Sequence, residues 1–186
     1  MTITLEKGGR CNLSHTSPPL QKVMIGLGWE LKPNASLDLD ASAFMLGKDG
    51  KLIASEFLVF YNNLKSPDGA IQHTGDNRTG IGDGDDEMLL VNLESIDPEV
   101  HEVIIAATIH NAIEKEQSFG LLNEAYIRLV NIDTRKEVAR YSLGSEFSDA
   151  TDIEFGRLLK TETGWSFEAL GKGATKGLEG LVSTYQ

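Results

Sequence analysis

The sequence predicts a mostly β protein, a two-sheet β-sandwich with short helical segments and a single domain spanning residues 1–186. Three observations lead to this fold class. Short segments rich in β-branched and aromatic residues recur along the chain, glycine, asparagine and aspartate separate them at fairly regular intervals, and helical periodicity is scarce. A chain of 186 residues buries roughly 70% of the surface of its unfolded form, so one core can hold it folded.

The expected strands follow from local composition. Each is a run of apolar, β-branched or aromatic residues, alternating at the edges of a sheet and continuous at its centre. They cover residues 2–5, 23–30, 37–46, 57–61, 88–93, 102–110, 125–131, 138–143, 153–160 and 165–170.

Turns, loops and helical pieces separate these strands. Asp49-Gly50 is a hairpin signal, and residues 133–136 form a second turn. Residues 8–20 and 111–122 are predicted loops because they are polar or rich in proline and glycine. We expect a short helical turn within residues 96–100 and one short helix within residues 177–185.

The segment 37–46 carries the first chemical signal. At the strand period of two, Asp38 and Asp40 lie on one side, followed by Ser42. The other side is apolar, with Leu37, Leu39, Ala41, Ala43 and Met45. The strand therefore begins with two carboxylates and ends apolar on both sides. An ordinary solvated strand end is the alternative interpretation.

The segment Asp76 to Glu87 is the second signal. It gathers carboxylates and glycines with almost no apolar residue. Glycine allows sharp turns that expose carbonyl oxygens, and Ca²⁺ binds about six to eight carboxylate and carbonyl oxygens. An EF-hand is excluded, because its sixth position needs glycine and neither Asp38 nor Asp83 has glycine five residues later. A solvated acidic loop remains the alternative.

A sandwich can complete such a site with loops from one end. Asp38 and Asp40, the turn at Asn62-Asn63, Asp68, and the segment 76–87 are predicted to meet there. Together they offer enough oxygens for more than one Ca²⁺. Unscreened carboxylates in close contact would repel by about 1–4 kcal/mol per pair.

Charge and cysteine content exclude several classes. The net charge of −11 argues against nucleic acid as a partner and against unaided docking on an anionic membrane. Cys11 is the single cysteine, so neither an intrachain disulfide nor a thiolate zinc site is expected. The N-terminal residues lack signal-peptide character and no apolar run has transmembrane length, so we expect a cytoplasmic protein.

No enzyme signature is present in the sequence. The four histidines show no metal-ligand or triad spacing, and no glycine-rich loop precedes a helix to hold phosphate. Cys11 has no evident base partner. We therefore expect a protein without catalytic activity.

A set of segments spread along the chain has a distinctive sequence: Trp29 and residues 37–44, 60–69, 73–80, 82–87, 108–110, 117–120, 125–131 and 139–141. In these segments the chain resembles the TerD family of tellurium-resistance and stress-response proteins. The resemblance covers nearly the whole chain, and its most specific part runs from Asn62-Asn63 to Glu87.

The resemblance implies a bacterial calcium-binding β-sandwich with two Ca²⁺ ions near one end. It implies a role in resistance to tellurite or other stress without known catalysis. The partners it implies are other tellurium-resistance and stress proteins, or a membrane-associated complex. The residues that would hold the metal, carried over by position, are Asp38, Asp40, Asn62, Asn63, Asp68, Asp76, Asn77, Asp83, Asp85, Asp86 and Glu87.

Three functions stay open at this point. The first is a cytoplasmic calcium-binding stress protein that acts through calcium-dependent ordering of its polar loops and through protein partners. The second is a calcium-dependent membrane-surface module of the C2 kind, although the sequence shows no exposed aromatic or basic loop beside the acids. The third is a metal-dependent hydrolase, for which no positioned base is found.

Overall fold

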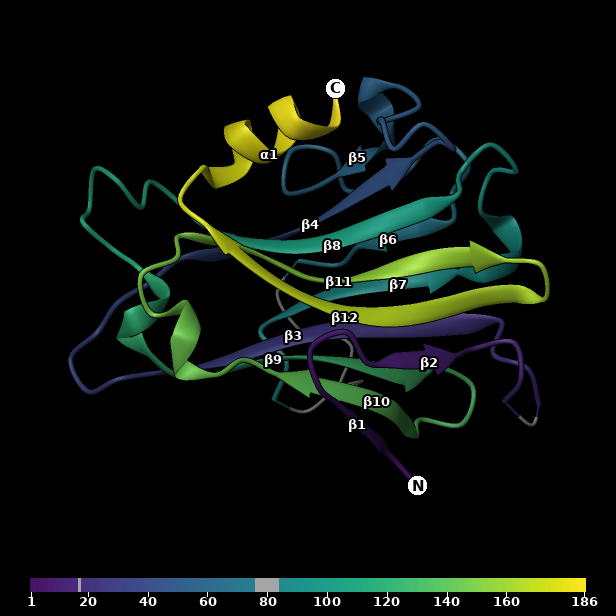
Figure 1. The fold of residues 1–186 in the computed structure, drawn as a ribbon, viewed down its shortest axis with the longest axis horizontal. Helices are drawn as coiled ribbons and strands as arrows, with labels where there is room; N and C mark the ends of the chain where they lie inside the picture. Colours follow the sequence, from purple (N-terminus) through teal and green to yellow (C-terminus); the bar gives the residue numbers. More distant parts are fainter. Residues whose placement is uncertain (17, 76–83) are drawn as a thin grey trace.

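The computed structural model describes residues 1–16, 18–75 and 84–186. Two six-stranded sheets pack face to face (Figure 1). This confirms the predicted mostly β sandwich in a single domain.

The two sheets have simple orders. Sheet A runs β1 (Ile3–Leu5), β10 (Glu137–Ser142), β9 (Leu122–Asn131), β3 (Lys22–Leu31), β7 (Glu87–Asn92) and β6 (Ile71–His73). Sheet B runs β2 (Arg10–Asn12), β12 (Gly164–Ala174), β11 (Asp152–Thr161), β8 (Glu102–Ile109), β4 (Leu39–Leu46) and β5 (Leu58–Val59). Between named strands the pairing is antiparallel, with β1 and β10 as the parallel exception.

Short helical pieces complete the described chain. One α-helix, α1 (Gly177–Tyr185), covers part of sheet B, as expected from the sequence. Four 3₁₀ turns lie at Ser55–Phe57, Leu93–Ser95, Phe119–Leu121 and Ser145–Phe147.

Several local expectations were wrong. The helical turn expected within 96–100 forms at Leu93–Ser95 instead, where the Asn92 side chain accepts a hydrogen bond from the Glu94 amide. The predicted loop 8–20 contains β2, because Arg10–Asn12 pairs with β12. The strand β6 was not expected, and β5 is shorter than predicted.

Alternation along β4 explains how the core is filled. Leu39, Ala41, Ala43 and Met45 belong to the main core between the sheets. Phe44 and Leu46 lie on the opposite side, in a second apolar cluster that includes Leu181 of α1. The predicted alternation is confirmed, and the apolar outer side at the end of β4 is explained by the helix that covers it.

Antiparallel pairing brings several polar strand ends to one end of the sandwich. The strands β4 and β7 start there, and β6 and β8 finish there, as the left-hand end of Figure 1 shows. The segment between β3 and β4 and the turns after Ile109 belong to the same end. We call it the carboxylate end, after Asp38, Asp40 and Glu87.

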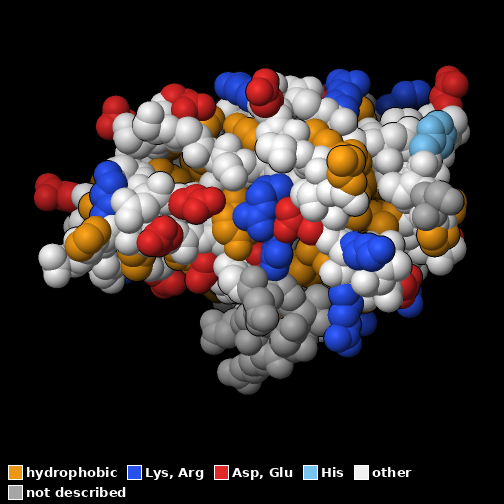
Figure 2. All heavy atoms as spheres, turned by 90° about the horizontal axis from the view of Figure 1, so that it is seen from below, with side chains coloured by type: hydrophobic (Ala, Val, Ile, Leu, Met, Phe, Trp, Pro, Cys, Tyr) orange, Lys and Arg blue, Asp and Glu red, His pale blue; other side chains and the backbone are white. Residues whose placement is uncertain are grey.

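Seen from below, the molecule shows the side that carries β1 and β10. Acidic and basic side chains lie next to one another there, with apolar side chains among them (Figure 2). Within the described residues, no helix combines the length and apolar character needed to cross a membrane.

Candidate metal site

Two aspartates mark the start of β4 at the carboxylate end. Asp38 is exposed, and its backbone carbonyl accepts a hydrogen bond from the amide of His110 at 2.8 Å. Asp40 is half-buried, and its Oδ2 lies 3.6 Å from Nδ1 of His110. His110 follows β8, which pairs with β4, so strand pairing holds the imidazole beside the carboxylates.

Glu87 approaches the same end from the other sheet. It continues the side of β7 on which Leu89 and Val91 face the main core, so its carboxylate is mostly buried. His73, at the end of β6, lies next to it: His73 Nε2 is 2.7 Å from Glu87 Oε2. The two buried atoms nevertheless lack hydrogen-bond geometry, and neither has another hydrogen-bond partner.

The tautomer of His73 follows from its second nitrogen. Nδ1 accepts a hydrogen bond from the amide of Gly75 at 2.9 Å, so the ring hydrogen is on Nε2, toward Glu87. We regard the short separation as an electrostatic contact, since an N–H group that close to a carboxylate attracts it even when bent. A nitrogen that carries hydrogen cannot bind a metal, so we do not count His73 as a ligand. Its contact with Glu87 Oε2 instead orients that carboxylate.

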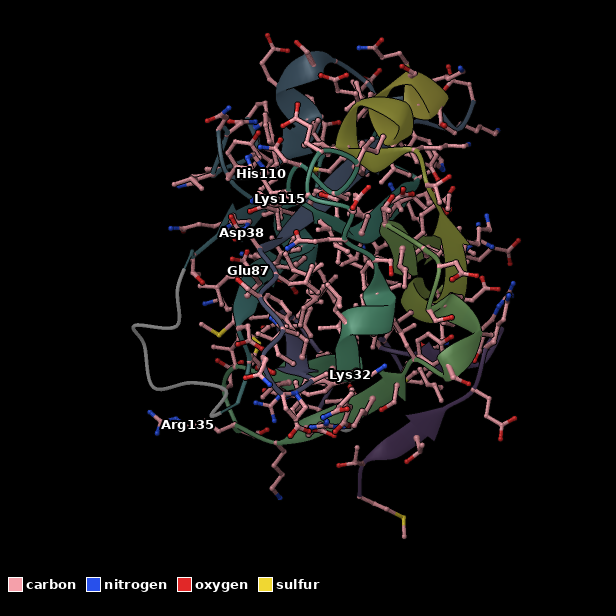
Figure 3. The ribbon with its side chains drawn as sticks, turned by 90° about the vertical axis from the view of Figure 1, so that its left-hand side faces the viewer. Lys32, Asp38, Glu87, His110, Lys115 and Arg135 are labelled. Carbon is pink, nitrogen blue, oxygen red and sulfur yellow. The ribbon has the colours of Figure 1, made fainter. Side chains whose placement is uncertain are left out.

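Electrostatics link the carboxylates of the two sheets. Burial raises the pKa of Asp40, and the negative charges of Asp38 and Glu87 raise it further. His110 and His73 act in the opposite direction. The structure therefore brings both Asp38 and Glu87 within electrostatic range of Asp40. Figure 3 labels Asp38, Glu87 and His110 at this end of the molecule.

Asp85 has a different environment from Glu87. Its side chain is fully buried, and both carboxylate oxygens accept hydrogen bonds from Nε of Arg128, at 2.9 and 3.0 Å. The Tyr126 hydroxyl also contacts it at 3.2 Å. A Cβ on Gly26 would overlap this carboxylate, so glycine in β3 makes room for the ion pair. Despite Arg128, burial raises the pKa of Asp85.

Asp86 is exposed and attached to the end of β3. Its Oδ2 accepts a hydrogen bond from the amide of Trp29 at 2.8 Å, and its own amide donates to Leu27 O at 2.8 Å. The pKa of Asp86 is raised, mainly by burial and further by the charges of Asp85 and Glu87. The hydrogen bond from the Trp29 amide acts in the opposite direction. One carboxylate oxygen thus fixes the chain where it enters β7.

In the turn after β5, the side-chain amide of one predicted ligand, Asn63, is used within the turn itself. The Asn63 side chain donates to the carbonyls of Glu56 and Leu58, at 3.0 and 2.7 Å, and so holds the turn together. Asn62 is exposed in the same turn.

Asp68 does not join the carboxylate end. Its Oδ1 accepts from the Ser66 hydroxyl and the Ala70 amide, and its Oδ2 accepts from the Asp97 amide at 2.8 Å. Asp68 precedes β6 and contacts Asp97, which precedes the start of β8 beside the end of β4, so Asp68 lies away from Asp40 at the start of β4 and the expectation that the two meet was wrong.

Three of the predicted ligands, Asp76, Asn77 and Asp83, lie outside the described residues. Within residues 1–16, 18–75 and 84–186, no three histidine, cysteine or carboxylate side chains are grouped closely enough to hold a metal ion. The described part of the site is thus a set of carboxylates in electrostatic range. Carboxylate oxygens are the ligands that a hard cation prefers, although Glu87 Oε2 already faces His73 Nε2 at 2.7 Å.

Sequence reasoning missed the two histidines at this end. Neither has a spacing that indicates metal binding, yet His73 orients Glu87 and His110 lies beside Asp40. The sequence signal that could have found His73 is strand alternation. Ile71 and His73 are two residues apart, so in a strand they face the same side, and both are buried.

Comparisons with known proteins agree with the fold. A family model described as the TerD domain matches residues 1–185. A tellurium resistance protein TerD from Alcaligenes sp is 46% identical over 187 residues, which cover all of this chain and 97% of that protein. General stress protein 16U of Bacillus subtilis is 39% identical over 188 residues, covering all of this chain and 97% of its own length.

A solved structure has the same architecture. The crystal structure of a homologue of telluride resistance protein from Streptomyces coelicolor superposes with a TM-score of 0.66 at 23% identity. The superposition covers 86% of this chain and 94% of that one.

Proposed function

Because the chain belongs to the TerD family of tellurium-resistance and stress-response proteins, we propose that it is a cytoplasmic calcium-binding stress protein. It acts by binding, without a catalytic step. The observation that carries the proposal is the approach of Asp38 and of Glu87, which belongs to the other sheet, to the half-buried Asp40.

The residues at this end have distinct tasks in the proposal. Asp38, Asp40 and Glu87 supply carboxylate oxygens, and His73 keeps Glu87 oriented. Asp85 and Asp86 fix the chain just before β7, through Arg128 and the Trp29 amide. Asp76, Asn77 and Asp83 are proposed to complete a site for two Ca²⁺ ions.

The physical effect of binding follows from charge. Carboxylates held together repel by about 1–4 kcal/mol per close pair. Calcium supplies the positive charge that removes this repulsion. The ends of β4, β6 and β7 would then be held together more firmly, and the surface they present to partners such as other stress proteins would change.

Calorimetric titration with CaCl₂ tests the proposal. We expect the wild-type protein to bind Ca²⁺, and Asp40→Asn and Glu87→Gln each to weaken binding about tenfold or more. Asp133→Asn is the matched control, because Asp133 is an exposed aspartate in the turn after β9, away from the carboxylate end. Absence of binding to the wild-type protein, or equal affinity in all four proteins, would refute the proposal.

A further inference from the structure

An open groove lies on the outer side of sheet B, beside α1. The helix packs on β4 and β8, where Leu181 joins Phe44 and Ile104 in the second apolar cluster. Figure 1 shows α1 on the β4 side of the sheet, with β11 and β12 next to it. The groove is bounded by α1, the start of β11, the end of β12 and the 3₁₀ turn Ser145–Phe147. Its volume of about 830 Å³ is that of a small-molecule site.

Two buried carboxylates line the groove from β11. Asp152 and Glu154 are 1% and 7% exposed. They share the outer side of the strand, because Ile153 between them belongs to the main core. Asp152 Oδ1 accepts hydrogen bonds from the amides of Lys176 and Gly177, at 2.7 and 2.8 Å, and so caps the start of α1. This oxygen of Asp152 is therefore engaged in holding the helix.

Glu154 has an oxygen that the fold leaves without a hydrogen bond. Its Oε1 accepts one from the Tyr185 hydroxyl of α1 at 2.5 Å, whereas Oε2 is buried and has no hydrogen-bond partner. Lys172 Nζ lies 3.7 Å from Oε2, which makes an ion pair too long for a hydrogen bond. The Lys172 side chain is 65% exposed, so it can move into solvent with little loss of packing. Because a buried carboxylate without a donor is unfavourable, Oε2 favours a closer ammonium group.

The charges favour a cationic organic ligand. The lysines that line the groove, Lys7, Lys172 and Lys176, are exposed, whereas the carboxylates on β11 are buried, so an anion in the groove would be repelled. A metal ion fits less well. Over residues 1–16, 18–75 and 84–186, no three carboxylate, cysteine or histidine side chains are grouped closely enough to hold one. An ammonium group brings its own N–H donors and can be held by few acceptors.

The rest of the groove extends this preference to a second positive charge. Glu146 and Asp149 are exposed at its rim, in and just after the 3₁₀ turn, while Phe147 and Leu181 add apolar lining. A chain of methylene groups with an ammonium group at each end matches this set: one charge for the buried Glu154, one for the rim, and apolar atoms for the methylenes.

We propose that the groove binds a linear aliphatic diamine or polyamine. One ammonium group donates to Glu154 Oε2, where it takes the place of the Lys172 ammonium, and a second lies beside Glu146 and Asp149. The groove contains none of the proposed calcium ligands, so this inference does not depend on calcium.

Calorimetric titration in metal-free buffer at physiological ionic strength tests the inference. The full chain is titrated with putrescine, with butylamine, which lacks the second ammonium group, and with the diol of the same length as putrescine. We expect putrescine to bind, butylamine to bind about tenfold more weakly, and the diol not to bind. The salt screens nonspecific attraction between the diamine and a protein of net charge −11.

Two variants should change the affinity for putrescine in opposite directions. Glu154→Gln keeps an acceptor for Tyr185 and removes the negative charge, so binding should weaken about tenfold or more. Lys172→Met removes the ammonium group that competes for Oε2, so binding should strengthen about two- to fivefold. The matched controls are Glu162→Gln, in the turn between β11 and β12, and Lys136→Met, in the turn between β9 and β10. Both residues are exposed, and the affinity should not change.

Four results would each overturn the inference. They are absence of putrescine binding to the wild-type protein, equal affinity for putrescine and the diol, equal effects of Glu154→Gln and Glu162→Gln, and unchanged or weaker binding in Lys172→Met. Circular dichroism shows whether Glu154→Gln is folded. If it is not, Lys172→Met against Lys136→Met decides the question, because Lys172 is exposed and its loss leaves the packing of sheet B intact.

Discussion

Replacing Asp85 with asparagine tests how the chain before β7 is held. The variant keeps the shape of the side chain and removes its charge. In the native protein both carboxylate oxygens are bound by Nε of Arg128, in a position with no solvent exposure of the Asp85 side chain. Tyr126 lies next to the pair, since its hydroxyl donates to Asp85 Oδ1 at 3.2 Å.

The expected loss of stability is about 2–3 kcal/mol. Breaking a buried ion pair by removing one partner costs about 3–5 kcal/mol. The value here should be lower, because Glu137 still lies 3.2 Å from Arg128 and compensates its charge. Burial also raises the pKa of Asp85, which means that burying its charge is costly. Part of the stabilisation by Arg128 only offsets this cost, so the net loss in Asp85→Asn is smaller.

Urea unfolding in the presence of a chelator measures this loss without any contribution from metal. Asp86→Asn is the matched control, because the neighbouring side chain is exposed and accepts one backbone hydrogen bond. It should cost about 1 kcal/mol or less. Gly26→Ala should also destabilise, since its Cβ would overlap the Asp85 carboxylate. A loss below about 1 kcal/mol in Asp85→Asn would refute the reasoning.

Three further predictions concern other parts of the molecule. Hydrogen bonding from Arg140 lowers the pKa of Glu137 below its ordinary value of 4.5. The ionised Glu137 therefore stabilises the folded protein above that pH, and this stabilisation is lost as the pH falls. Urea unfolding between about pH 5 and 3 should therefore show a weaker pH dependence in Glu137→Gln than in the wild-type protein, and equal slopes would contradict this. Tyr185→Phe removes the 2.5 Å hydrogen bond from the Tyr185 hydroxyl to the buried Glu154 and should cost about 1–3 kcal/mol in urea unfolding, whereas an unchanged midpoint would speak against it. Cys11 is 3% exposed and burial raises the pKa of its thiol, so a thiol reagent should label it much more slowly in buffer than in urea, and equal rates would show an accessible thiol.

Periodicity predicted the strands that have a distinct pattern. The long strands β3, β4, β8 and β9 were found because their apolar residues alternate or run continuously. By contrast β2 and β6 have three residues each, too few for a period to be visible. They are strands because β12 and β7 offer them hydrogen-bond partners, which is a property of the assembled sheet.

Residue type indicated the chemistry of the candidate site but not the partner of each carboxylate. The pair of Asp85 and Arg128 joins residues 43 apart in the chain, and no local pattern connects them. Asp68 looked equivalent to Asp40 in the sequence. It differs because its oxygens are taken by Ser66, Ala70 and Asp97, which only the turn conformation makes available.

The three consecutive acids at the start of β7 show why position matters more than composition. Asp85 precedes the strand and reaches Arg128 through the space left by Gly26, so its charge is already compensated. Asp86 is fixed to the Trp29 amide. Glu87 is the first residue of the strand and points to the core side, where it contacts His73 and raises the pKa of Asp40. Of these three acids, Glu87 is the one with a carboxylate neighbour on the other sheet, Asp40, so it is the member of the acidic run with most to gain from a cation. If the proposed calcium site forms, the stability of the chain before β7 and the affinity for calcium should therefore depend on different acids, although these acids are adjacent in the sequence.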